Sequence, residues 1–315
     1  MATTPSIESP SLFRLLVGDG RPLLAVAALV LLFAGVFALF VAVRGEFLPH
    51  DIAFLGMTAP ELCAVHGCRI VHFMVHDRVA FGGALVAVGV VYLWLIVGPM
   101  SHGERWVWDL LVASGGVGFA SFLAYLGYGY LDMWHGAATA LLAPLFAVGL
   151  IVARWRISWI ADDRRWMARP LWLTSHRDRQ CVGRALLLFA AAGMVGGGLT
   201  IVAVGMTSVF VPEDLAYLGV GRAELEPLNP RLIPLIAHDR AGFGGAVCCC
   251  GVVLAGIAWR ARFDRAAMQA LAVAGMAGFG TAILVHPAIG YNDLWHLIPA
   301  FGGAVAFACG WWLLR

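Results

Sequence analysis

The sequence predicts an all-α polytopic membrane protein whose eight transmembrane helices form two tandem four-helix bundles of the same topology. Three observations lead to this prediction. Hydrophobic residues make up 61% of the 315 residues and charged residues only 13%, whereas soluble domains average nearer half and a quarter. Eight apolar runs are long enough to span a bilayer, which takes about twenty residues each. Three short motifs also occur twice, in the same order, about 162 residues apart.

The apolar runs divide the chain into two halves, residues 1–160 and 185–315, joined by a basic linker at 161–184. The eight expected spans are 23–43, 78–97, 107–127, 136–153, 185–209, 241–259, 267–285 and 294–314. An even number of spans places both termini on one side of the membrane. Most arginines lie in the linker or on its side, so the termini and linker are expected to be cytoplasmic, in an inner or plasma membrane. The net charge of +2 argues against a nucleic-acid partner and leaves the lipid bilayer as the expected one.

The repeated motifs indicate an internal duplication. Residues 47–57 (FLPHDIAFLGM) match residues 210–220 (FVPEDLAYLGV). The segment HDRVAFGG at 76–83 is followed by HDRAGFGG at 238–245, and GYLDMWH at 129–135 by GYNDLWH at 290–296. With four spans in each half, the two copies should have the same orientation and be related by an axis along the membrane normal.

Histidine and aspartate recur together in these motifs. We expect four histidines to open the even-numbered spans on the extracytoplasmic side, each with an aspartate nearby. They are His76 with Asp77, His135 with Asp132, His238 with Asp239, and His296 with Asp293. Ionisable groups at the membrane are costly and therefore suggest a functional site.

The interpretation we favour from the sequence is a membrane redox protein that binds a b-type heme in each half, near the extracytoplasmic face. His76 with His135, and His238 with His296, would be axial ligands, as paired imidazoles are in heme proteins. Gly83 and Gly245 lie about two turns below a histidine, where they would leave room for the porphyrin or simply allow close helix contact. Arg78 and Arg240 would meet the heme propionates, and the aspartates would orient the imidazoles. A quinol or another membrane redox partner would exchange electrons with the heme.

A second interpretation is a metal-dependent enzyme. The same histidines and aspartates (His76, Asp77, Asp132, His135, His238, Asp239, Asp293 and His296) offer mixed nitrogen and oxygen ligands, which suit zinc or non-heme iron. Asp132 and Asp293 could instead be helix N-caps, and Asp77 a local partner of Arg78. In a third interpretation nothing is catalysed, and the polar set belongs to a membrane subunit or a transporter.

The layout resembles the heme A synthase family, which has eight helices in two four-helix halves and a histidine on helices two, four, six and eight. The resemblance implies that His76 and His135 correspond to the pair that holds the substrate heme, and His238 and His296 to the pair that holds heme b. It also matches Cys63 and Cys68 to the cysteine pair of the first external loop. The chain departs from the family motif in having Phe73 where a glutamate precedes the helix-two histidine.

The halves are unequal, and the first is the better candidate for catalysis. It alone contains His72, one turn before His76, together with Cys63 and Cys68. Candidate catalytic residues are therefore His72, Asp77 and Asp132. In an oxidising compartment the two cysteines are expected to form a disulfide, either a structural link or a redox-active pair.

Overall fold

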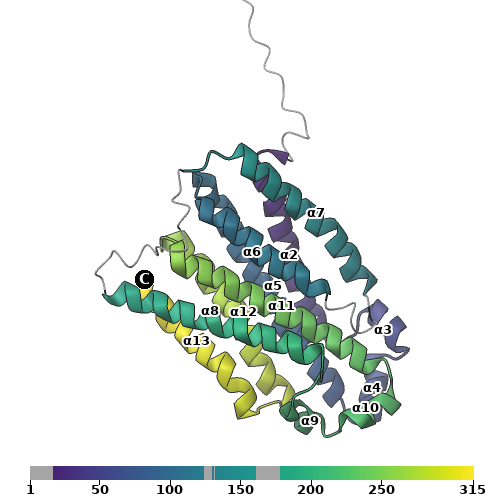
Figure 1. Ribbon diagram of the computed structural model, residues 1–315. Helices are drawn as coiled ribbons and strands as arrows, with labels where there is room; N and C mark the ends of the chain where they lie inside the picture. The colour runs from purple at the N-terminus through teal and green to yellow at the C-terminus, as the bar shows by residue number, and fades with distance from the viewer. Residues whose placement is uncertain (1–16, 124–129, 131, 161–177) are drawn as a thin grey trace, which may run out of the picture.

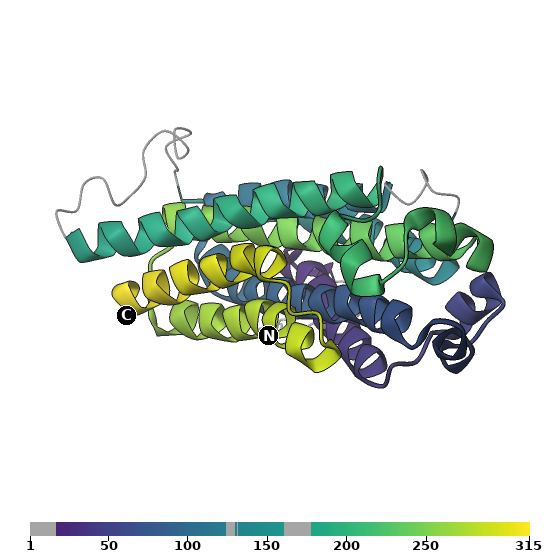
Figure 2. The same ribbon diagram turned by 90° about the horizontal axis from the view of Figure 1, so that it is seen from below.

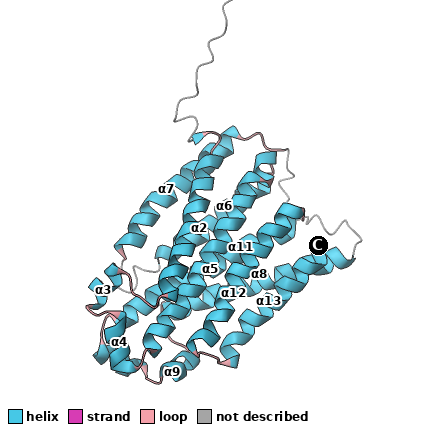
Figure 3. Ribbon diagram, turned by 180° about the vertical axis from the view of Figure 1, so that it is seen from behind, coloured by secondary structure: helices cyan, strands magenta, loops and turns pink. Residues whose placement is uncertain are grey.

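The computed structural model describes residues 17–123, 130, 132–160 and 178–315 of the chain. Across these ranges the regular structure is helical throughout, and seven helices are long and apolar enough to cross a membrane. Figure 1 shows one elongated bundle with short helices gathered at one end. Figures 2 and 3 show the long helices running roughly along a common direction. The architecture agrees with the prediction of an all-α, multi-pass membrane protein.

Short helices precede the second long helix of each half, and the described part of the chain otherwise runs mainly from one long helix to the next. The long helices are α2 (Arg21–Val43), α5 (Arg69–Val97), α6 (Arg105–Ser121), α7 (Met133–Arg156), α8 (Asp178–Gly205), α11 (Leu232–Arg260), α12 (Arg265–Ile289) and α13 (Leu294–Leu314). The short ones are α3 (Pro49–Leu55), α4 (Ala59–His66), α9 (Pro212–Leu218), α10 (Arg222–Leu228) and a 3₁₀ turn at Pro99–His102. Of the expected spans, only 107–127 lacks a helix of spanning length, since α6 has 17 residues and residues 124–129 lie outside the described ranges. Most of the expected linker, 161–177, also lies outside them.

Two helices form the centre of the bundle. The most apolar windows of α5 and α11 are 67% and 72% buried, whereas those of α2, α7 and α8 are 22% buried. The outer helices present large apolar side chains on their free faces, such as Phe33, Phe40 and Phe189. A helix that is apolar on its exposed face is suited to contact with lipid, because lipid tails solvate such side chains.

The two halves of the chain are interlocked. In each half the third long helix packs on the central helix of the other half, so that α12 lies against α5 and α6 lies against α11. The close contact between α12 and α5 requires glycine at residue 83, because a Cβ there would lie 2.5 Å from the carbonyl oxygen of Ala277. The arrangement therefore differs from two separate four-helix bundles placed in tandem.

Close contacts within each half also depend on glycine. A Cβ on Gly35 of α2 would lie 2.6 Å from the carbonyl oxygen of Gly82 in α5, and a Cβ on Gly198 of α8 would lie 2.5 Å from the backbone nitrogen of Cys248 in α11. Small residues at such crossings let membrane helices approach closely and gain packing energy.

Candidate functional site

The central helices carry their histidines inside the helix rather than at its start. The apolar pattern predicted starts at residues 78 and 241, but α5 begins at Arg69 and α11 at Leu232. The expectation that His76 and His238 open their helices is therefore wrong. The added turns are held by buried apolar residues such as Ile70 and Leu235, and they place both histidines in the interior, at 3% and 4% exposure.

Short helices before the central ones position a buried carboxylate in each half. Pro49 and Pro212 occupy the first turns of α3 and α9, where the missing N–H of proline is tolerated. The carboxylate of Asp51 accepts a hydrogen bond from the backbone N–H of Leu48, and that of Asp214 accepts one from Val211. The Leu/Val-Pro-x-Asp sequence thus fixes where each carboxylate lies.

Each central helix then supplies an arginine that joins the two halves. Arg78 donates from Nη1 to Asp51 at 2.7 Å and from Nε to Asp239 at 2.8 Å. Arg240 lies 2.8 Å from Asp214 through Nη2 and 3.4 Å from Asp77 through Nε. Each guanidinium therefore links the loop carboxylate of its own half to the central-helix carboxylate of the other. The planar fork of arginine suits two carboxylates at once.

Three histidines form what we call the His76 centre: His76, His286 and His296. The Nδ1–H of His76 donates to Asp77 at 2.9 Å, which turns its Nε2 toward the Nε2 of His286, 3.1 Å away. The ring of His296 lies 5.5 Å from that of His76 and 5.2 Å from that of His286, between centroids. One nitrogen from each of the three lies within 4.8 Å of the others.

A second group, which we call the Asp132 centre, contains Asp132, His135 and His238. One oxygen of Asp132 caps α7 by accepting from the backbone N–H of Trp134 at 2.8 Å. The other lies 2.8 Å from Nδ1 of His135 and 2.9 Å from Nε2 of His50. Nδ1 of His135 is also 3.1 Å from Nε2 of His238, and the ligand atoms of the three residues lie within 4.8 Å of one another.

The carboxylate of Asp132 is held in its charged form. Burial would raise its pKa, but the hydrogen bond and charge of His135, the charge of His50 and the N–H of Trp134 together lower the pKa well below its usual range. The carboxylate therefore stays ionised, which is the form that can bind a metal ion.

Two tyrosines tie the loop carboxylates to the centres. Tyr130 donates to Asp51 at 3.2 Å, and Tyr291 donates to Asp214 at 2.8 Å while its oxygen lies 3.2 Å from Nδ1 of His296. Burial, and then the charge of the neighbouring aspartate, raises the pKa of both hydroxyls well above the usual range. Both tyrosines therefore stay protonated and act as donors.

The structure groups the expected histidines across the halves. His76 meets His296 and His238 meets His135, whereas the sequence suggested pairs within each half. The carboxylate of Asp293 accepts a hydrogen bond from the backbone N–H of His296 and so caps α13, as the N-cap interpretation predicted. Asp293 is not part of either centre.

Other expected site residues lie elsewhere or have other partners. His72 is on the exposed face of α5, outside both centres. A Cβ on Gly83 would meet Thr281, and one on Gly245 would lie 2.2 Å from Cβ of Ser121, so both glycines face a neighbouring helix. The sites expected to receive porphyrin are therefore filled by α12 and α6.

Several residues in or next to the two centres were not assigned a role from the sequence. Tyr130 and Tyr291 stand in the repeated motif GYxDxWH, so the repeat contained a signal for them. His50 also precedes a motif aspartate directly. His286 had no such signal, because the expected span ended at residue 285 while α12 continues to Ile289.

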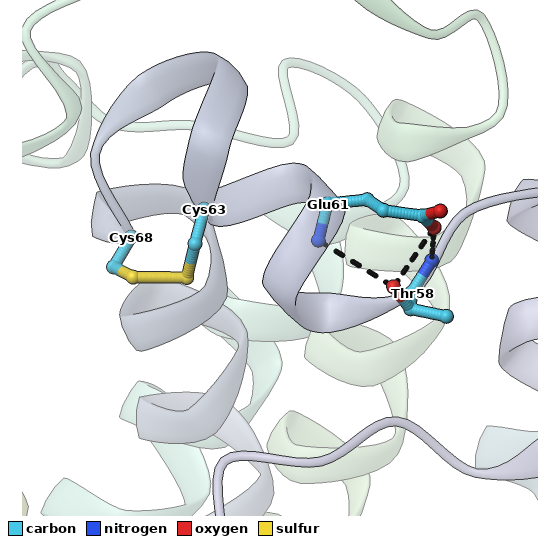
Figure 4. The surroundings of a disulfide bond; sticks show 4 residues. All are labelled: Thr58, Glu61, Cys63 and Cys68. Atoms are coloured by element: carbon cyan, nitrogen blue, oxygen red, sulfur yellow. Dashed lines mark hydrogen bonds between the residues drawn. A yellow bond between two sulfur atoms is a disulfide. The ribbon is translucent and has the colours of Figure 1, made fainter.

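Cys63 and Cys68 are bonded as a disulfide (Figure 4). The bond joins the last turn of α4 to the residue that precedes α5. Next to it, Thr58 and Glu61 form a capping box at the start of α4, with the backbone N–H of Thr58 donating to Glu61 at 2.7 Å. The capping box thus fixes the start of α4, and the disulfide fixes the turn that leads from α4 into α5.

The chain matches no family model, no curated protein and no solved structure in the three comparisons made.

Proposed function

We propose that this chain is a metal-dependent membrane enzyme in which the His76 centre and the Asp132 centre each bind a transition-metal ion. The distance of 3.1 Å between Nε2 of His76 and Nε2 of His286 carries the proposal. Two nitrogens bound tetrahedrally to one zinc ion lie about 3.3 Å apart, given bond lengths of about 2.0–2.1 Å. The two imidazoles are therefore already spaced as ligands of one ion.

The orientation of His76 supports the same conclusion. Metal-binding histidines commonly donate the second ring N–H to a carboxylate, which fixes the tautomer and makes the ligand nitrogen more basic. Asp77 accepts this bond from Nδ1, so that the lone pair of Nε2 points at the centre. Arg240 lies beside the other oxygen of Asp77 and holds that carboxylate in place.

The ligand types favour zinc or non-heme iron. Three imidazoles at one centre, and two imidazoles with a carboxylate at the other, are sets that both metals use in enzymes. Three protein ligands leave a coordination position for water or substrate, and the ion supplies Lewis acidity there. Tyr291 at the His76 centre, and His50 at the Asp132 centre, orient the surrounding ligands through the bonds described above.

A b-type heme fits these residues less well. Imidazole nitrogens in contact at 3.1 Å leave no layer between them for a flat macrocycle. Arg78 and Arg240, expected at the propionates, already lie between two carboxylates each. Redox chemistry with heme and a quinol partner is therefore the competing hypothesis.

We also propose the finer features of the architecture that the sequence indicates. The matching contacts of Asp51 with Arg78 and of Asp214 with Arg240 support a duplication. In that case α6 is the counterpart of α12 and belongs to the span that brings the total to eight. Both termini would be cytoplasmic, and the two centres would lie at the extracytoplasmic end of the bundle.

Cobalt titration tests the proposal. Purified protein, treated with chelator and titrated with Co²⁺, should develop the visible absorption of a cobalt centre with nitrogen ligands. The His286→Ala variant should lose the cobalt absorption that comes from the His76 centre. The His72→Ala variant should keep the absorption of both centres, because His72 lies outside them. A protein that binds no cobalt, zinc or iron would contradict the proposal and favour a non-catalytic or transport role.

A further inference from the structure

Each centre has two buried residues and one that is only partly buried, which is His296 at the His76 centre and His135 at the Asp132 centre. The side chain of His135 is 37% exposed. His50, which touches Asp132, is 19% exposed. A substrate can therefore reach the Asp132 centre past His135.

The start of α7, which holds His135, is loosely covered by the described part of the chain. Among the residues of this helix, those that are buried begin at Phe146, more than ten residues after His135. A Cβ on Gly136 would meet no described atom within 4 Å. Within the described ranges, the first three turns of α7, which begin next to the Asp132 centre, are therefore largely uncovered.

The surface below His135 is mainly apolar. Ala138 and Leu142 follow His135 at three and seven residues, spacings that place side chains on one face of a helix. Thr139, at four residues, adds a hydroxyl of the kind that can bond to the carbonyl one turn before it in a helix. Next to this face Leu141 is 76% exposed. Because α7 has the length and composition of a membrane span, these side chains lie toward the acyl chains rather than toward water.

A polar metal centre at the end of an apolar, lipid-facing strip suits a molecule of the same polarity. We propose that the substrate of the Asp132 centre is an amphiphile dissolved in the membrane, with an oxygen-donor head group that reaches the metal and an apolar tail that lies along Ala138 and Leu142. This inference rests on the proposed function, because the metal is what holds the head group. It adds the class of substrate and the side from which it enters.

Two hydroxamates with the same head group and different tails test the inference. Octanohydroxamate and acetohydroxamate are titrated into cobalt-loaded protein that carries His286→Ala and His296→Ala, so that only the Asp132 centre remains. We expect octanohydroxamate to shift the cobalt spectrum at a concentration about tenfold or more below that of acetohydroxamate, because burial of its methylenes adds to binding. A variant with His135→Ala and His238→Ala should lose this response.

A pair of matched substitutions shows where the tail lies. Ala138→Phe should abolish most of the advantage of the longer hydroxamate while the response to acetohydroxamate stays. Ala300→Phe, four residues after His296 on α13, should leave both responses unchanged. Equal responses to the two hydroxamates, or an advantage that survives Ala138→Phe, would overturn the inference and leave the metal proposal intact. A protein that binds no cobalt at the Asp132 centre would overturn both.

Discussion

Nδ1 of His76 lies 2.9 Å from a carboxylate oxygen of Asp77, and both side chains are buried. The aspartate that follows His76 in the chain thus fixes which ring nitrogen is free for a ligand. The same carboxylate lies beside Arg240 from the other half of the chain. One interaction between neighbouring residues therefore connects the His76 centre to the contact between the halves.

Asp77→Asn should weaken the metal affinity of the His76 centre by about 10–100-fold, the usual effect of losing a carboxylate that orients a histidine ligand. Competition with a chromophoric chelator measures the affinity. Asp293→Asn is the matched control, because Asp293 caps α13 and asparagine also caps helices well. If both variants bind metal equally, Asp77 does not orient a ligand.

Arg78→Ala should destabilise the protein by about 3–5 kcal/mol, since it leaves the buried carboxylates of Asp51 and Asp239 without their cation. Arg78→Lys should restore only part of this loss, because an ammonium cannot bridge two carboxylates as the guanidinium fork does. Thermal unfolding in detergent measures both.

Arg44→Ala is the control for these variants. Arg44 pairs with Glu46 on the surface, where such pairs contribute about 0–1 kcal/mol. Equal losses from Arg44→Ala and Arg78→Ala would show that the link between the halves adds little.

Gly198→Leu should destabilise the bundle by about 1–3 kcal/mol or more, because the added side chain overlaps the backbone of α11 at Cys248. Gly193→Leu, on the same helix, should have little effect, since a Cβ there meets no described atom within 4 Å. The midpoint of thermal unfolding distinguishes the two. Similar midpoints would contradict the close approach of α8 and α11.

The disulfide reports the side of the membrane on which the centres lie. In a variant with Cys181→Ser and Cys309→Ser, a membrane-impermeant maleimide should label intact cells only after Cys63 and Cys68 are reduced. Labelling from the cytoplasmic side alone, in inverted vesicles, would contradict the proposed orientation. Loss of the disulfide should lower the free energy of unfolding by about 2 kcal/mol, as expected for so short a closed loop.

The helical class and most span positions could be predicted, because long apolar runs in a charge-poor chain have few other stable arrangements. The starts of α5 and α11 could not. Hydropathy starts the first of these spans only after the polar His76 and Asp77, yet the helix includes both. Hydrogen bonds hold these polar side chains and Arg78 inside the bundle, with His286 as a partner of His76, and Asp51 and Asp239 as partners of Arg78.

The residues of the site could be predicted better than their partners. Repetition of the motifs pointed to His76, His135, His238 and His296, and these four all belong to the two centres. Their grouping depends on α12 and α6 crossing to the other half, and an identical motif in each half contains no information about that crossing. His286 joins its centre only through this packing.

Metal content and the visible spectrum of the purified protein, measured together, distinguish two metal centres from a heme protein. We expect zinc or iron bound at up to two ions per chain, one at each centre, with no Soret band. The metal content per chain should fall by about half in the His286→Ala variant and stay unchanged in the His72→Ala variant. A Soret band that disappears in His238→Ala, in a protein without stoichiometric zinc or non-heme iron, would contradict metal binding at the two centres.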